Sequence, residues 1–358
     1  MVHYGKGFPS CRFSDYSFEL KIINVNRRTM FQSSTQKHFW TFSNEQDIYT
    51  LRREANSTYI NQHKGAAKRM GQDVKSFFLL AEEEHILCRH YEHLLRDFCR
   101  RFEPPMPPAV KGTACAYFKR FYLRNTVMDY HPKFIMLTCV YLACKVEEFN
   151  VSITQFCANL SSDQERAAEL ILVHELLVMQ QLDFHLTVHN PLRPLEGFLI
   201  DIKTRFSSLS NPEQLRKSAD EFLQRSFASD VCLLYTPSQI ALTALVTSAA
   251  KQRVNIDKYV TDFLLKSSDK KELRDLVSTI KRVRSMVNNI PPLDIEVVKA
   301  LEEKLEKCGN PELNPDSEEY KRKQQEFLDA EDEDFSLGIS SAQDKKSQRR
   351  EVELLMSV

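Results

Sequence analysis

The stretch HPKFIMLTCVYLACKVEEF, residues 131–149, decides the fold. Pro132 suits the first position of a helix, because proline has no backbone N–H and its φ is already helical. The residues that follow are apolar on nearly every side of a helix until the charges begin at Lys145. A helix that is apolar all round lies inside a bundle rather than on its surface. We therefore predict a buried central helix whose C-terminal end, at Glu147 and Glu148, reaches solvent or a partner.

Composition limits the class of protein. The 358 residues are 42% hydrophobic and 27% charged, with 8 glycines and 14 prolines, a balance that suggests a helical globular chain of two domains with tails. The 49 basic residues equal the 49 acidic ones. A dedicated nucleic-acid binder usually carries a basic excess, so we expect no direct contact with DNA or RNA. No apolar run is long enough to span a membrane, and no membrane association is expected.

Apolar periodicity predicts helices on both sides of the central one, and no strands. In the first half of the chain the predicted helices are Ala81–Phe102, Val110–Arg124, the central segment, Ser152–Leu160 and Glu165–Leu182. In the second half they are Pro194–Phe206, Pro212–Ser229, Thr236–Gln252, Ile256–Leu265 and Lys271–Asn289. The predicted fold class is therefore all-α.

The two halves contain an internal repeat. HPKFIMLTCVYLACK from His131 matches TPSQIALTALVTSAAK from Thr236. An ungapped overlay places identical residues on one another: Pro132 on Pro237, Ile135 on Ile240, Leu137 on Leu242 and Thr138 on Thr243. A shared order of this kind predicts two helical units with matching central helices. Chance similarity between two buried helices is the alternative.

The patterns divide the chain into segments. Two repeats occupy residues 81–189 and 190–290, and a C-terminal helix occupies 291–308. The remaining segments are predicted as an irregular N-terminal extension at 1–42, a helix followed by a solvated basic loop from Ser57 to Lys75 at 43–80, and a polar, acidic, disordered tail at 309–358. The break in pattern makes Met30 a candidate natural start.

The sequence contains no catalytic motif that we recognise. It has no Gly-rich phosphate loop, no G-x-S-x-G elbow and no kinase signature, and His174-Glu175 lacks the second histidine of a zinc-protease motif. The 9 cysteines form no CxxC pair and no cluster with zinc spacing, which predicts buried, reduced thiols. We predict no catalytic residue, no metal and no cofactor, and favour a binding module over an enzyme.

With these features the chain resembles the cyclin family. The resemblance covers roughly Ser43 to Cys308, and its short motifs are KRFYL at 119–123, ACKVEE at 143–148 and LDFHL at 182–186. Longer stretches are similar to the cyclin that regulates the CDK-activating kinase: KHFWTF at 37–42, GTACAYFKRFYL at 112–123 and NPLRPLEGFLIDIKTRF at 190–206. The resemblance implies tandem five-helix cyclin boxes with flanking N- and C-terminal helices.

The resemblance also implies a kinase-binding site. In cyclins a lysine at the end of the central helix and a glutamate on the fifth helix grip the kinase backbone, and these fall on Lys145 and Glu175. A lysine supplies donors and a glutamate supplies acceptors, so together they can pair with the C=O and N–H groups of a partner loop. Val146, Glu148 and Phe149 are the predicted neighbours in the same surface. The alternative is an ion pair within the domain, which contributes little.

The partners implied by the resemblance are a cyclin-dependent kinase catalytic subunit, a RING-finger assembly factor and the core of TFIIH, in the nucleus. The chain would be a regulatory subunit without catalysis of its own, supporting phosphorylation of CDK activation loops and of the RNA polymerase II C-terminal repeats. Two other readings stay open. TFIIB-like factors also contain tandem cyclin folds and bind DNA and polymerase, although the balanced charge disfavours this class. A structural scaffold is the third.

Overall fold

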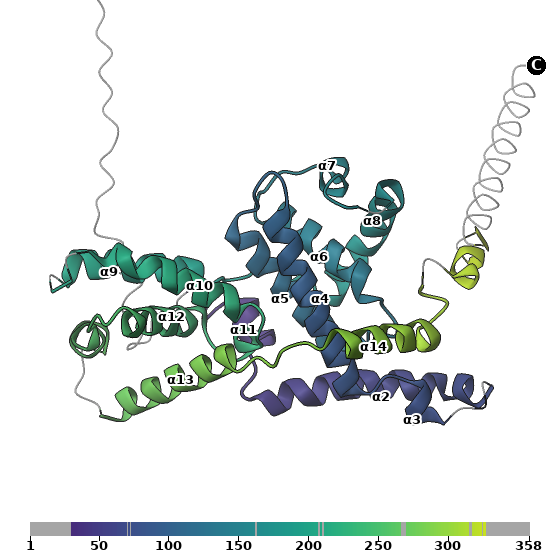
Figure 1. Ribbon diagram of the computed structural model, residues 1–358, viewed down its shortest axis with the longest axis horizontal. Coiled ribbons are helices and arrows are strands. Elements are labelled where there is room, and N and C mark those ends of the chain that lie inside the picture. Colours follow the sequence, from purple (N-terminus) through teal and green to yellow (C-terminus); the bar gives the residue numbers. More distant parts are fainter. Residues whose placement is uncertain are drawn as a thin grey trace, which may run out of the picture.

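The computed structural model describes residues 30–326 except positions 70, 72, 162, 207, 210, 266–269, 315, 316 and 324. These residues form helices joined by turns and short loops, with no strand among them, which confirms the all-α prediction (Figure 1). No helix in this described part is long and apolar enough to cross a membrane.

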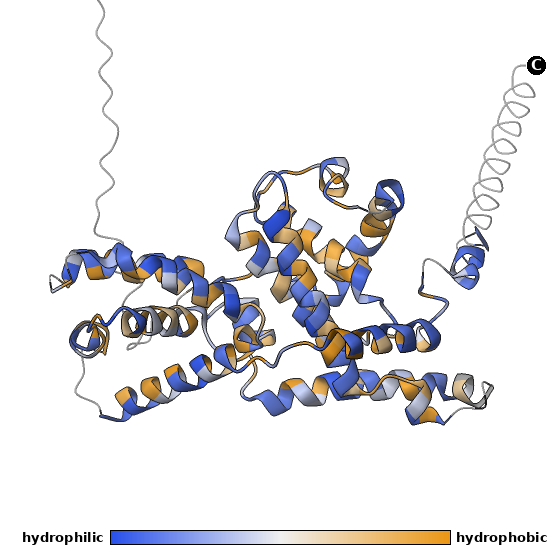
Figure 2. Cartoon of the chain, viewed as in Figure 1, coloured by the Kyte–Doolittle hydropathy of each residue, from blue (hydrophilic) through white to orange (hydrophobic). Residues whose placement is uncertain are grey.

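The first unit is built around α6. It consists of α4 (Ala81–Arg101), α5 (Pro108–Arg124), α6 (Pro132–Val146), α7 (Ile153–Cys157) and α8 (Gln164–Gln181). Every residue of α6 from Ile135 to Cys144 is buried, and the helix packs against α4, α5 and α8. Figure 2 shows α6 largely hydrophobic, whereas α2 is largely hydrophilic. The predicted central helix is confirmed.

The second unit repeats this plan around α12. It consists of α9 (Leu192–Arg205), α10 (Arg216–Ser226), α11 (Val231–Leu234), α12 (Pro237–Lys251), the π-helical turn η3 (Tyr259–Leu265) and α13 (Lys270–Asn288). The single helix predicted from Pro212 to Ser229 is wrong at its start, because Pro212–Leu215 is a 3-10 turn, η2, that precedes α10. Helix α12 packs against α9, α10 and α13.

The internal repeat is visible in the backbone as well as in the sequence. Helices α6 and α12 both begin with proline, after the N-caps His131 and Thr236. In both, the second residue after the helix has a positive φ, 57° at Glu148 and 58° at Arg253. The hydrogen bonds that close the two turns match: Phe149 N donates to Cys144 O and Val254 N donates to Ala249 O, each at 2.9 Å. The overlay with an offset of 105 residues is therefore structural, and chance similarity is excluded.

The flanking helices α2 (Glu45–Arg69) and α14 (Ile295–Cys308) pack on the first unit (Figure 1). Helix α14 contacts α4 and α3 (Val74–Phe77), and α2 contacts α3, α4 and α5. The hydroxyl of Tyr59 donates to Cys308 O at 2.8 Å and joins the two flanking helices. They extend the first core and leave the second unit with its own core.

Three segment predictions need correction. The basic loop predicted from Ser57 is helical as far as Arg69, because Tyr59 and Ala67 are buried against the first core at helical spacing. Residues 30–42 of the predicted irregular extension contain α1 (Thr35–Phe39), which the hydroxyl of Ser34 caps. Residues 318–323 of the predicted disordered tail are helical. Residues 1–29 and 327–358, including the acidic and basic runs of the tail, lie outside the described residues.

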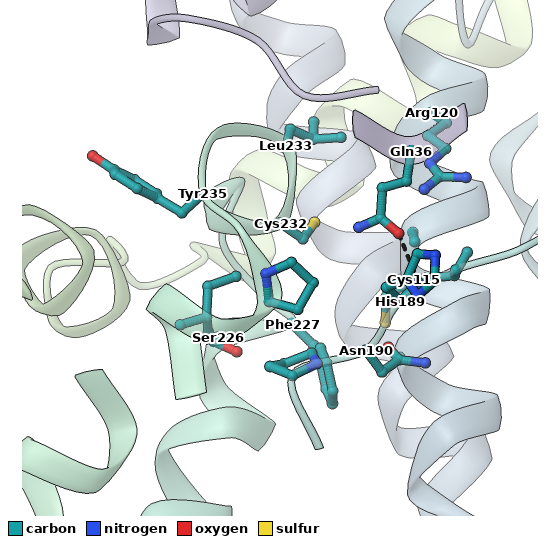
Figure 3. A pocket seen from close by; sticks show the side chains of 16 residues that line it. Gln36, Cys115, Arg120, His189, Asn190, Ser226, Phe227, Cys232, Leu233 and Tyr235 are labelled. Carbon is teal, nitrogen blue, oxygen red and sulfur yellow. Dashed lines mark hydrogen bonds between the residues drawn. The ribbon is translucent and has the colours of Figure 1, made fainter. Parts of the chain in front are cut away.

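A partly buried charge network lies where the two units meet. Asp230, just before α11, accepts from Arg52 of α2 at 2.7 Å and lies 3.3 Å from the ammonium of Lys119 on α5. Lys119 in turn pairs with Glu92 of α4 at 2.6 Å. A small cavity of about 20 Å³ lies at the same junction, between α5 and the second unit (Figure 3). It has room for roughly one water molecule, far less than a cofactor needs.

Candidate functional site

Lys145 and Glu175 meet at the surface of the first unit. Lys145 is the penultimate residue of α6, and its Nζ lies 2.6 and 2.8 Å from the two carboxylate oxygens of Glu175 on α8. The ammonium also sits 4.7 Å from the ring centroid of Tyr141, one helical turn earlier. The Lys145 side chain is 46% exposed and that of Glu175 15%. The two residues predicted by resemblance are therefore paired and accessible.

The pair keeps capacity for a partner. An ammonium has three donors and a carboxylate can accept about four hydrogen bonds, so the contact between Lys145 and Glu175 uses only part of either group. The ion pair is also the alternative that sequence reasoning left open. The ion pair in the free chain is compatible with both alternatives, a kinase-binding site and a pair that acts only within the domain. At a surface, the same two groups can also form hydrogen bonds with the backbone of a docked partner.

The other predicted site residues follow Lys145 in the turn that ends α6. Val146 and Phe149 are half-buried and pack against the first core, whereas Glu148 is exposed. The adjacent Glu147 is held inward, because the hydroxyl of Thr113 donates to its carboxylate at 2.5 Å. This capped end of α6 fixes the direction in which the Lys145 side chain leaves the helix.

An apolar strip that the sequence analysis missed lies beside Glu175. Leu172, Val173 and Leu176 of α8 are each about half exposed, although the opposite side of the same helix is buried. Isolated exposed apolar residues are ordinary, but three on one helix face form a strip that a partner could cover. Helix α8 is apolar on two faces, at ELILVHELLV from 169 to 178, and that second face was the available signal. We call Lys145, Glu148, Leu172, Val173, Glu175 and Leu176 the α6–α8 surface.

One histidine of α8 and the cysteines of the described part were also candidates for chemistry. His174 is buried on the inner side of α8, where its Nδ1 donates to Leu170 O at 2.7 Å, and burial lowers its pKa. Burial raises the pKa of Cys232 and of Cys308 to about 11, so both thiols stay protonated at neutral pH. The eight cysteines of the described part are unpaired, six of them buried and two half-buried.

In the part of the chain that the structure describes, no group of three or more His, Cys, Asp or Glu side chains could hold a metal ion. The α6–α8 surface offers hydrogen bonds, one ion pair and apolar contact, which suit binding of a protein.

Comparisons with known proteins agree with this architecture. Residues 90–187 match the family of the cyclin N-terminal domain, and residues 190–288 that of the cyclin C-terminal domain. Cyclin-H of Xenopus laevis is 47% identical over 297 residues, which cover 82% of this chain and 91% of that protein. The probable cyclin-H of Echinococcus multilocularis is 31% identical over 319 residues, covering 81% and 95% respectively.

A solved structure gives the same result. A chain in the structure of the CAK complex of Chaetomium thermophilum bound to ATP-gamma-S shares the fold with a TM-score of 0.67 at 25% identity, covering 84% of this chain and 94% of that one. Its agreement extends beyond a single unit, because the coverage includes both repeats. The chain therefore belongs to the cyclin family, and within it to the cyclin H group.

Proposed function

We propose that this chain is the cyclin subunit of a CDK-activating kinase, without catalysis of its own, and that its α6–α8 surface holds the kinase catalytic subunit in the active state. The observation that carries the proposal is the Lys145–Glu175 pair, at 2.6 Å, beside the exposed apolar strip of α8. The 47% identity to a cyclin-H over 82% of the chain supports the choice of kinase class.

The mechanism follows from how kinases are switched. A protein kinase is active only when the lysine of its third strand pairs with a glutamate of its αC helix. A partner that binds the inward position of αC better than the outward one shifts the equilibrium toward activity. In the proposed complex, Leu172 and Leu176 cover apolar residues of the αC segment, and Lys145 and Glu175 bond to its backbone groups.

The α6–α8 surface is rigid, which suits the docking of a kinase. Helix α6 is buried over most of its length and α8 packs along it, so the surface is formed before the kinase arrives. Docking then orders few side chains of the cyclin, which lowers the entropy cost of association. The Lys145–Glu175 pair is a surface ion pair that contributes at most about 1 kcal/mol to folding, so its main effect is expected in binding.

The wider assembly is part of the proposal. A RING-finger assembly factor and the TFIIH core would be further partners, in the nucleus. The activated kinase would phosphorylate the activation loops of other cyclin-dependent kinases and the C-terminal repeats of RNA polymerase II. The cyclin H relatives support this assignment through their sequence similarity.

The experiment that tests the function mixes the full chain with a panel of purified CDK catalytic subunits and measures kinase activity with and without it. We expect strong activation of the CDK-activating kinase subunit and little effect on the others. Activation of a different kinase alone would contradict the cyclin H role. Binding to no kinase, together with DNA binding that weakens steeply with salt, would favour a TFIIB-like function instead.

A further inference from the structure

Arg120 of α5 is a buried cation at the junction of the two units. The residue is 2% exposed, and one of its terminal guanidinium nitrogens donates to His185 O at 3.2 Å. The guanidinium carbon lies 5.3 Å from the Trp40 ring centroid. The Nε atom has no hydrogen-bond partner among the described residues. The guanidinium is thus in contact with a neutral carbonyl and an aromatic ring, and neither carries a full negative charge.

The preceding residue shows what balances a buried cation in this protein. Lys119 is also 2% exposed, and its ammonium pairs with Glu92 at 2.6 Å and with Asp230 at 3.3 Å. Buried charges in proteins are normally paired in this way, because an unpaired charge loses its hydration without compensation. Within the described part of the chain, no carboxylate is paired with Arg120.

The charge of Arg120 persists at neutral pH. Burial lowers its pKa to about 10, and the groups that oppose this shift are Cys232 and Tyr117 rather than a carboxylate. A guanidinium with this pKa keeps its proton at pH 7, so proton loss does not relieve the cost of burial. The positive charge therefore needs a negative counterpart from outside the described side chains.

A cavity adjoins this charge. Its volume is about 20 Å³, and it is lined by Arg120, by Gln36 of α1 and by residues of the second unit that include Cys232 (Figure 3). The described residues that line it include no Asp or Glu. The amide oxygen of Gln36 accepts from His189 N at 2.7 Å, and Figure 3 shows the amide nitrogen on the side of Cys232. The cavity is thus lined by a cation and by a hydrogen-bond donor.

From the unbalanced charge and the adjoining cavity we infer that the junction binds one monatomic anion, chloride, as the counter-ion of Arg120. A halide is close in size to a water molecule, and the cavity has room for about one water. The guanidinium of Arg120 would supply the charge, and the amide of Gln36 a further donor. The ion would join α1 and α5 to the second unit, apart from the Asp230 network. This inference does not depend on the proposed function.

The first test compares the stability of the full chain in sodium chloride and in sodium gluconate at equal ionic strength. General screening of charge is then the same in both salts, and gluconate is too large for the cavity. With a Kd of about 10 mM, chloride at about 100 mM should lower the unfolding equilibrium constant about tenfold. Equal stability in the two salts would overturn the inference.

Two variants show whether the effect belongs to Arg120. In Arg120→Met the difference between chloride and gluconate should disappear, whatever the stability of the variant itself. Arg124→Met is the matched control, because Arg124 also lies on α5 over the Trp40 ring but pairs with Asp183 at 2.7 Å. It should keep the full chloride effect. A chloride effect of the same size in Arg120→Met as in wild type would overturn the inference.

A crystallographic measurement on wild type decides the question even if Arg120→Met does not fold. Crystals grown in sodium bromide should show an anomalous difference peak in the cavity beside Arg120. Density for water alone at this position would overturn the inference. A bromide peak without any chloride-dependent stability in solution would mean an adventitious ion only, and would overturn it as well.

Discussion

The Lys145 side chain is held in place by its neighbours, yet its ammonium stays accessible. The side chain of Tyr141 is buried beneath its ammonium, and Glu175 faces it across the α6–α8 junction. A long lysine that packs along an aromatic ring loses rotamer freedom before any partner arrives. The equivalent residue of the second unit is the exposed Ala250, at the same offset of 105 residues. At the residue scale, the position of Lys145 therefore differs between the two repeats.

Glu84 gives a prediction about stability rather than binding. Burial raises its pKa to about 8, although hydrogen bonds from Thr126 and Asn56 oppose the shift. The folded protein therefore holds this proton more tightly than the unfolded chain, whose carboxyl has the ordinary value of 4.5. Stability is lost as the pH rises from about 4.5 to 8, because only the unfolded state releases the proton there.

We expect Glu84→Gln to change this pH dependence. The variant stays neutral, so its thermal midpoint relative to wild type should rise between pH 5 and pH 8. Glu82→Gln, on the exposed side of the same helix, is the control. Hydrogen bonding to Tyr49 lowers the pKa of Glu82, so its variant should differ from wild type by a constant amount over this range. Parallel pH profiles for Glu84→Gln and wild type would contradict the assigned pKa.

At the element scale, the charge network around Asp230 joins α2, α4 and α5 to the second unit. Burial alone would raise the pKa of Asp230, but Lys119 and Arg52 lower it far below its usual range. Removing one member of a buried charge network leaves another charge without its partner, which is costly. This network, rather than apolar contact alone, fixes the second unit against the flanking helix.

Asp230→Asn tests this account of the junction. The substitution keeps the side-chain volume and removes the charge, and we expect it to lower the free energy of unfolding by about 3 kcal/mol. Asp183→Asn breaks the exposed pair with Arg124 and is the control, with an expected loss below about 1 kcal/mol. Chemical denaturation measures both. If both variants lose the same free energy of unfolding, the Asp230 network contributes no more to stability than an exposed ion pair does.

The elements also show where sequence reasoning succeeds. Helix α6 was predictable because it is apolar on every side, and the repeat identified α12. The first part of α2 was predicted as a helix, but its continuation beyond Ser57 was not, because Tyr59 and Ala67 are the few buried apolar residues in an otherwise polar stretch. The exposed strip of α8 was missed, since apolar periodicity cannot distinguish a face for the core from a face for a partner. Lys145 and Glu175 were predicted from the family resemblance, because their separation in the sequence does not by itself imply a contact.

At the scale of the whole molecule, two similar units have unequal roles. The flanking helices thicken the first unit and leave the C-terminal end of α6 and the outer face of α8 uncovered, whereas the second unit is attached through the Asp230 network. The second unit also has an exposed Lys–Glu pair, Lys251 with Glu221 at 3.2 Å, but it joins α12 to α10 rather than to a fifth helix. We therefore expect the first unit alone to hold the kinase.

The most direct measurement compares kinase activation by two double variants. Lys145→Ala with Glu175→Ala should reduce the affinity for the CDK-activating kinase catalytic subunit by about tenfold or more, and its activation at limiting concentration accordingly. Lys251→Ala with Glu221→Ala removes a similar exposed pair and should activate like wild type. A Lys145/Glu175 double variant that binds and activates as well as wild type would contradict the central claim that this pair holds the kinase.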